Sequence, residues 1–203
     1  MTPPNTAPEP ATTPIVLASS SPYRRQLLER LGIPFSVASP DVDETPRTGE
    51  APDAQVRRLA ETKARAVAAA HRAALVIGSD QLAAMEGVVF GKPGDHAGAT
   101  QQLRRMRGRA VTFYTGLCLH HSGSGATVTD CVPFVVSFRE YSDAEIERYL
   151  AREQPYGCAG SFMSEGLGIG LVKSLRGDDP SALIGLPLIR LGEMLRAAGV
   201  SIP

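Results

Sequence analysis

Apolar and polar residues form segments of two kinds along the chain. Short apolar runs bounded by turn residues are typical of buried strands, and apolar residues three or four positions apart are typical of helices. The pattern predicts strands over residues 15–18, 35–39, 74–78, 110–121 and 126–138, and a hairpin over 82–93. It predicts helices that begin at residues 22, 52, 96 and 143, and a last helix over 188–198.

Strands and helices alternate along the chain, which is typical of α/β proteins. The strands at 110–121 and 126–138 are joined by a short polar loop, so the sheet is expected to be mixed rather than all-parallel. Helix starts carry capping signals, namely Asp95, and Ser142 with Glu145. With 203 residues, 43% of them hydrophobic, the chain can form one domain with a real core, predicted over residues 14–203.

Composition narrows the classes of function. Lys plus Arg and Asp plus Glu both number 21, so no basic excess is available for a nucleic-acid backbone. Residues 1–13 are rich in Pro and Thr and lack the apolar core of a signal peptide, so a disordered tail is expected. No apolar run approaches the ~20 residues that span a bilayer, so no membrane partner is expected. Cys118, Cys131 and Cys158 are widely spaced, which fits free thiols in a reducing, cytoplasmic location.

The stretch from Leu17 to Phe35 places serines and arginines at the start of a predicted helix. Ser21 fits the N-cap and Pro22 the first helical position. Arg24 and Arg25 lie in the first turn, where the helix dipole disfavours cations. Two interpretations stay open. The stretch is either a capped surface helix with solvated arginines or a site where hydroxyls, backbone N–H groups and arginines bind a phosphate.

Other charged residues stand at conspicuous places in the pattern. The acidic loop 41–45, DVDET, has carboxylates that suit Mg²⁺ or Mn²⁺, although such a loop alone is more often simply solvated. Asp80 follows the apolar run 74–78, and ligand sites in open α/β sheets gather at such strand ends; a helix cap or turn cap is the other interpretation. Lys63 lies in an apolar helix stripe, where a lysine either snorkels to water or finds an anion. Lys92 sits in the turn FGKPGD without a Walker motif.

These positions together supply cations, carboxylates and a base. Hydrolysis of a polyphosphate needs cations that neutralise charge, a carboxylate-bound metal and a base that positions water. The glycines of residues 166–170 lack the strand-turn-helix context of a dinucleotide fingerprint, and no Ser/His/Asp or Cys/His set stands out. The sequence therefore indicates chemistry on a polyphosphate.

The motifs LASSSPYRR, DVDE, LAETKA, GSDQ, GKP and CAGSFMSEGLGI…ALIGLPL, in this order, resemble those of the Maf family of nucleoside triphosphate pyrophosphatases. The resemblance runs from about Ile15 to Gly199. It implies a two-lobed α/β fold of the Maf and ITPase type, with an elongated mixed β-sheet flanked by helices and a central cleft. It also implies a hydrolase that cleaves the α–β bond of a nucleotide and releases pyrophosphate, with Mg²⁺ or Mn²⁺ as the expected cofactor.

The resemblance assigns site residues where the motifs match. The phosphate-binding residues would be Ser19, Ser21, Arg24, Lys63 and Lys92. The metal-linked acids would be Glu44 and Asp80, with Asp80 as the proton acceptor. The specificity positions would be Tyr23, Gln81 and Glu165.

GSDQ together with SFMSEG is similar to the subgroup that acts on 7-methyl-GTP, which implies hydrolysis to 7-methyl-GMP and pyrophosphate as house-cleaning of modified nucleotides. The cationic 7-methylguanine suits the aromatic face of Tyr23, and the Glu165 carboxylate can accept from its N1–H and 2-amino group. Two residues depart from the subgroup: Tyr23 stands where Trp is expected, and Met163 where Lys is common.

Two alternative functions stay open from the sequence. One is a nucleotide-binding regulator of cell division without turnover, and the other is a Maf enzyme that prefers dTTP or UTP. The complete set of acids and cations favours an enzyme, because a sensor needs no metal site and base together. The expected partner is a small nucleotide, and a homodimer is an expectation from the family alone.

Overall fold

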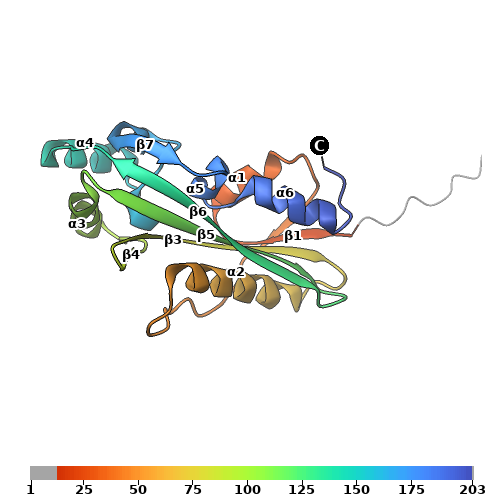
Figure 1. The fold of residues 1–203 in the computed structure, drawn as a ribbon. Coiled ribbons are helices and arrows are strands. Elements are labelled where there is room, and N and C mark those ends of the chain that lie inside the picture. The colour runs from red at the N-terminus through yellow and green to blue at the C-terminus, as the bar shows by residue number, and fades with distance from the viewer. Residues whose placement is uncertain (1–12, 203) are drawn as a thin grey trace, which may run out of the picture.

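Residues 13–202 are described by the computed structural model, and they form a mixed sheet of seven strands with helices on both faces (Figure 1). The sheet order is β2-β1-β3-β5-β6-β7, with β4 paired to β3 off this path. The strands are β1 (Ile15–Ala18), β2 (Ser36–Ala38), β3 (Leu75–Met85), β4 (Val88–Phe90), β5 (Ala110–His121), β6 (Thr127–Phe138) and β7 (Val172–Arg176). The predicted α/β class with an elongated mixed sheet is confirmed. The predicted tail lies, apart from Thr13, outside the described residues.

Six α-helices flank the sheet within residues 13–202. They are α1 (Pro22–Glu29), α2 (Pro52–Ala68), α3 (His96–Met106), α4 (Asp143–Glu153), α5 (Pro180–Ile184) and α6 (Leu188–Ala197), with 3-10 turns η1 (Ala159–Ser161) and η2 (Leu167–Leu171) after α4. The predicted caps are present, since Asp95 accepts from the backbone of Gly98 and Ser142 forms a capping box with Glu145. The apolar pattern does not predict α5, because five residues between Pro and Gly carry too little periodicity.

Parallel and antiparallel pairings occupy different parts of the sheet. β1 pairs in parallel with β2 and β3, and the pairs β3–β5, β5–β6 and β6–β7 are antiparallel. β5 and β6 run along almost the whole length of the molecule (Figure 1). The predicted hairpin turns at Glu86 and Gly87, whose φ values of 52° and 78° match the type I′ turn favoured between two strands.

The predicted end of the third strand at Gly78 is wrong. β3 continues to Met85, because β5 pairs with it in antiparallel register across the polar residues 79–81 that interrupt the apolar run. The parallel partner β1, however, ends at Ala18, opposite Gly78. Asp80 therefore lies within β3, two residues beyond Gly78, the last residue of this strand that pairs with β1.

Helix α2 packs very closely against β3 and β5. A Cβ at Gly78 would collide with the backbone oxygen of Ala60. One at Gly116 would collide with that of Val56, so only glycine permits this approach. The short distance brings Lys63, on the same helix, next to β3.

Two main hydrophobic cores lie along the sheet and correspond to the two lobes that the resemblance implies. The core under α1 and α6 contains buried aliphatic side chains, among them Leu17, Leu28 and Leu191. The core between the sheet, α3 and α4 is rich in aromatic side chains: Phe90, Phe113, Phe134, Phe138, Tyr141, Tyr149 and Phe162. No helix within residues 13–202 combines the length and apolarity needed to cross a membrane.

Candidate active site

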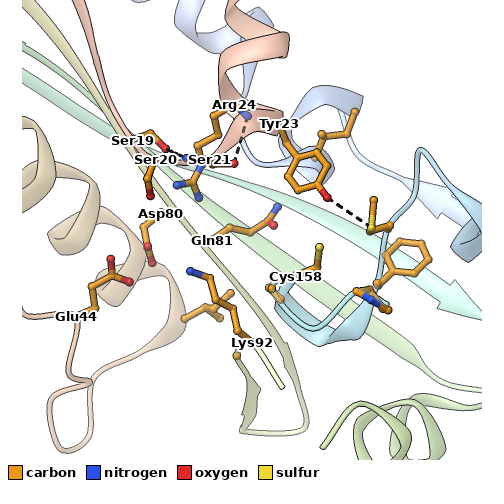
Figure 2. A pocket seen from close by; sticks show the side chains of 18 of the residues that line it. Ser19, Ser20, Ser21, Tyr23, Arg24, Glu44, Asp80, Gln81, Lys92 and Cys158 are labelled. Atoms are coloured by element: carbon orange, nitrogen blue, oxygen red, sulfur yellow. Dashed lines mark hydrogen bonds between the residues drawn. The ribbon is translucent and has the colours of Figure 1, made fainter. Parts of the chain in front are cut away.

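A cavity of about 790 Å³ lies between α1, α2, β3 and the loop that follows α4. Its volume is within the range of small-molecule sites. All ten residues assigned by resemblance line it: Ser19, Ser21, Tyr23, Arg24, Glu44, Lys63, Asp80, Gln81, Lys92 and Glu165. The structure thus brings together side chains that are up to 146 positions apart (165 − 19), as Figure 2 shows for most of them.

The cavity has two ends with different linings. We call the first the sheet end, formed by Ser19, Ser21, Arg24, Glu44, Lys63 and Asp80. The second is the loop end, formed by Tyr23, Glu153, Cys158, Met163 and Glu165. Gln81 and Lys92 lie between the two ends (Figure 2).

The serine turn at the sheet end leads directly into α1. The Oγ atom of buried Ser19 accepts a hydrogen bond of 3.1 Å from the backbone N–H of Ser21. Ser21 is the N-cap, as predicted, and its Oγ accepts from the backbone N–H of Arg24 at 3.4 Å. The turn therefore places hydroxyl groups and the positive end of a helix dipole on the cavity wall, where an anion is favoured.

The two adjacent arginines of α1 point to different places. Arg24 enters the cavity, and its Nε donates to the backbone oxygen of Gly185 at 2.8 Å. Arg25 pairs instead with Glu29 at 3.0 Å on the surface, where 64% of its side chain is exposed. Burial lowers the pKa of Arg24, against the opposing effect of nearby carboxylates, but an arginine keeps its charge under such shifts. One arginine is thus a surface residue and the other supplies a cation to the cavity.

Lys63 forms ion pairs with two carboxylates and does not extend to the solvent. It is 5% exposed, and its Nζ lies 2.6 Å from Oδ1 of Asp80 and 2.8 Å from Oε1 of Glu44. Partial burial raises the pKa of Glu44, but the hydrogen bond and charge of Lys63 outweigh burial and leave that pKa below its ordinary value. Lys92 and Arg24 act in the same direction as Lys63. Glu44 is therefore ionised at neutral pH.

Glu44 and Asp80 are hard oxygen donors of the kind that Mg²⁺ and Mn²⁺ prefer. Within residues 13–202, no three His, Cys, Asp or Glu side chains are grouped as a metal site. Mg²⁺ is commonly held by one or two carboxylates together with substrate phosphates and water. The Lys63 ammonium between the two carboxylates shows that a cation is favoured there, so the donor set fits a metal that binds together with a phosphate.

Gln81 lies between the two ends and is fixed by its amide nitrogen. Nε2 lies 2.8 to 3.0 Å from the backbone oxygens of Ala182 and Leu183 and from Oγ1 of Thr115, and these three acceptors share its two N–H groups. Because backbone oxygens cannot donate, the nitrogen and not the oxygen must face them. The amide oxygen is then the group that Gln81 can offer to a molecule in the cavity.

The loop end combines an aromatic ring with carboxylates. Tyr23 donates from its hydroxyl to Sδ of Met163 at 3.8 Å, which is a weak contact (Figure 2). Glu165 is exposed and accepts from the hydroxyl of Ser164 at 3.1 Å. Burial has the largest effect and raises the pKa of Tyr23, and negative charge on Cys158, Glu165 and Glu153 raises it further. The phenol is therefore neutral and its ring lines the cavity.

Two residues at the loop end were not predicted. Glu153 is the last residue of α4, and it accepts from the backbone N–H of Leu167 at 2.5 Å, which ties the loop carrying Glu165 to the helix. Burial, Glu165 and Glu153 raise the pKa of the Cys158 thiol to about 11, while Lys92 lowers it. Glu153 lies in none of the quoted motifs, and Cys158 begins the motif CAGSFMSEGLGI but is identified from the sequence only as a free thiol.

A mixed sheet with helices on both faces and a charged cavity of small-molecule size are typical of an α/β enzyme. The chain belongs to the family of Maf-like proteins, whose profile matches residues 14–198. The resemblance in the motifs is thereby confirmed.

Several relatives are similar to this chain over nearly their whole length. A protein of Nitrosococcus oceani named 7-methyl-GTP pyrophosphatase is 57% identical over 192 residues, which cover 95% of this chain and 96% of the relative. Proteins with the same name from Nitrosospira multiformis and Methylobacillus flagellatus are 56% and 54% identical. These two matches each cover 93% of this chain, and 95% and 98% of the relatives.

Proposed function

We propose that this protein hydrolyses 7-methyl-GTP to 7-methyl-GMP and pyrophosphate with the help of a divalent metal. The observation that carries the proposal is that a buried carboxylate, Asp80, lies beside the cations Lys63 and Arg24 in a cavity whose other end holds Glu165. The relatives named for this activity, more than half identical over nearly the whole chain, support the choice of substrate.

The sheet end is suited to bind the triphosphate. Arg24 and Lys92 would neutralise phosphate charge, and charge-assisted hydrogen bonds of this kind are about twice as strong as neutral ones. Ser19 and Ser21 would add hydroxyl contacts at the start of α1. Lys63 has three N–H donors, of which two are used by Asp80 and Glu44, so one remains for a phosphate oxygen.

Asp80 would act as the proton acceptor. The ammonium of Lys63 holds one carboxylate oxygen, and among the described residues the other oxygen has no hydrogen-bond partner. A water held by that oxygen would attack the α-phosphorus, the bond from this phosphorus to the bridging oxygen would break, and pyrophosphate would leave with the bonding electrons. The proton of the water passes to Asp80.

Glu44 and Asp80 would hold the metal together with phosphate oxygens, and the bound metal supplies charge neutralisation at the phosphates. Lys63 keeps both carboxylates in place until the substrate arrives. Removal of the divalent cation by a chelator should therefore abolish turnover and leave the fold intact.

The loop end would bind the base. The ring of Tyr23 can stack on the cationic 7-methylguanine, and Glu165 can accept from its N1–H and 2-amino group. Glu153 adds a second negative charge close to the first, which suits a positively charged base. Gln81 contributes an acceptor oxygen between base and phosphates.

A pyrophosphate-release assay tests the proposal. The purified protein is supplied with Mg²⁺ or Mn²⁺ and with 7-methyl-GTP, GTP, UTP or dTTP. We expect the highest kcat/KM for 7-methyl-GTP. Tight binding without release would favour a regulator, and higher kcat/KM for UTP or dTTP would favour the pyrimidine-preferring alternative; either result overturns the proposal.

A further inference from the structure

The backbone oxygen of Gly185, at the end of the short helix α5, accepts hydrogen bonds from side chains of other elements. A helix end leaves carbonyl groups without a backbone partner. Here the oxygen of Gly185 accepts from Nε of Arg24 at 2.8 Å, and Oγ of Ser79 lies 2.9 Å from it. The Ser79 hydroxyl lies equally close to the oxygen of Gly116, so its one proton is shared between the two carbonyls. The turn that follows α5 therefore joins α1, which carries Arg24, to the central strand β3, which carries Ser79.

The turn itself is fixed from several sides. The carboxylate of Asp179, 3% exposed, accepts from the backbone N–H groups of Ser181 at 3.1 Å and Ile189 at 2.8 Å, so it caps α5 and α6 together. Thr115 donates from Oγ1 to the oxygen of Ala182 at 2.8 Å. These bonds leave the carbonyl of Gly185 little freedom to turn.

Gly185 has a backbone conformation that other residues rarely adopt. Its φ is 124° and its ψ is 6°, a region open essentially to glycine. A Cβ at this position would lie 3.4 Å from Nε of Arg24. The unusual conformation thus aims the carbonyl at Arg24 and also leaves room for its guanidinium group.

The contact with Gly185 uses Nε of Arg24 and not its two Nη groups. An arginine has five N–H donors, and Nε provides only one of them. Within residues 13–202, Nη1 and Nη2 of Arg24 make no hydrogen bond and no ion pair, and the side chain lines the cavity. A fork held by Nε presents its Nη donors in one fixed orientation, which lowers the entropy lost when an anion binds.

We propose that Gly185 is a positioning residue, which acts through Arg24 to fix the guanidinium for a phosphate of the substrate. The inference rests on the proposed function in one respect only, namely that a phosphate-bearing molecule binds at the sheet end. The inference adds the backbone carbonyl of Gly185 to the groups that shape the phosphate-binding part of the cavity.

The test is a double-mutant cycle measured by calorimetric binding of inorganic pyrophosphate, without turnover. Arg24→Ala should weaken binding about tenfold to a hundredfold, because it removes charge-assisted hydrogen bonds. Gly185→Ala should weaken it by up to the same factor, because a small misplacement of a binding group costs up to ~10²-fold. In the Arg24→Ala protein, Gly185→Ala should weaken binding no further, since it has no guanidinium left to position. Gly199→Ala is the matched control: its φ of 83° is also positive, and it lies outside the cavity.

Additive losses in the cycle, or normal pyrophosphate binding by folded Gly185→Ala, would overturn the proposal. If Gly185→Ala fails to fold, Ser79→Ala takes its place, because it removes the hydroxyl whose proton is shared between this carbonyl and that of Gly116. It should weaken binding by a smaller factor, and again only while Arg24 is present; an equal loss without Arg24 would count against the proposal. Nucleotide turnover by the wild-type protein separates this outcome from a failure of the proposed function.

Discussion

The two ends of the cavity differ in how their side chains are held. At the sheet end, Ser19, Lys63 and Asp80 are at most 7% exposed and stand on regular elements or directly beside one. At the loop end, Glu165 is exposed, and its loop is tied to α4 by the contact of Glu153 with Leu167. Arg24, Lys63 and Asp80 thus stand on helices and a strand, while Glu44 and Lys92 stand on loops. At the loop end the exposed carboxylate of Glu165 stands on a loop. Such a loop can change specificity without disturbing the charges at the sheet end.

The largest effect is expected at the sheet end, for Asp80→Asn. Asparagine has almost the same shape but neither accepts a proton at neutral pH nor gives a metal a full charge. Loss of a general base typically lowers the rate by ~10²–10⁴-fold. We expect that loss in kcat for every nucleotide, measured by pyrophosphate release.

Asp143→Asn serves as the control, because Asp143 is an exposed residue that pairs with Arg104 and Arg107 away from the cavity. Near-normal turnover by a correctly folded Asp80→Asn protein would contradict the role of Asp80. A loss restricted to nucleotides with one base would mean that Asp80 recognises the base and does not act in hydrolysis. The proposed difference between the two ends would then be wrong.

A smaller and equally base-independent effect is expected for Arg24→Ala. A hydrogen bond to a charged group contributes about 1.5–3 kcal/mol, so KM for all triphosphates should rise by about tenfold to a hundredfold. Binding of 7-methylguanosine, which has no phosphates, should hardly change. Arg25→Ala is a closely matched control, since the neighbouring arginine pairs with Glu29 outside the cavity. A changed base preference with unchanged triphosphate affinity would mean that Arg24 contacts the base and not the phosphates.

The comparison of the two arginines shows how far sequence reasoning reaches. The helix start, its Ser21 cap and its first turn follow from local pattern. The pattern gives Arg24 and Arg25 the same status, however, and only the distant Gly185 carbonyl separates them. Contacts over 161 positions have no local signal, so the motif and not the periodicity singled out Arg24.

The same limit explains the other outcomes. Most of the sheet was predictable, because apolar runs and hairpin turns are local signals. The predicted β3 is too short, because its pairing with β5 continues the strand through three polar residues. For Lys63 the pattern left snorkelling and an anion open, and the choice depends on Glu44 and Asp80 from other segments. Glu153 was not predicted, because no motif marks this last residue of α4 and its place in the cavity depends on distant segments.

The loop end should respond to substitution in the opposite manner, as Glu165→Gln tests. A carboxylate has two acceptor oxygens and no donor, which matches the N1–H and 2-amino group of 7-methylguanine. Glutamine can donate to a pyrimidine carbonyl but leaves one guanine donor without an acceptor. An unpaired donor costs ~1–3 kcal/mol, so the preference for 7-methyl-GTP over UTP should fall by about one to two orders of magnitude.

The measurement is kcat/KM for 7-methyl-GTP, GTP, UTP and dTTP in both proteins. Glu147→Gln is the control, a neighbouring charge on α4 that does not line the cavity. Equal losses on all four nucleotides would give Glu165 the behaviour of the sheet end, and an unchanged ratio would remove it from base recognition.

The smallest effect concerns the charge of the loop end and needs no substrate. Burial and the carboxylates of Glu165 and Glu153 raise the pKa of the Cys158 thiol to about 11, so the thiol is protonated at neutral pH. Only a thiolate reacts with iodoacetamide, so alkylation of Cys158 should be slow near neutral pH and rise toward pH 11. Glu153→Gln removes a negative charge that opposes the thiolate, so the pKa should fall and alkylation at a fixed pH should become faster. Lys92→Met should act in the opposite direction, because the ammonium stabilises the thiolate.

A partly exposed charge contributes about 0.2–1 kcal/mol, which is less than one pH unit and less than a tenfold change in alkylation rate. Mass spectrometry of the peptides gives the rate at each cysteine separately. Cys131 is the internal control, since burial and the charges of Arg57, Asp53 and Asp130 set its pKa, also about 11, without Glu153. A change at Cys158 alone would sharpen the contrast between an acidic loop end and a sheet end in which cations and carboxylates are paired. Equal changes at Cys131 would mean that the substitution altered the whole fold, and the electrostatic explanation of the loop end would be wrong.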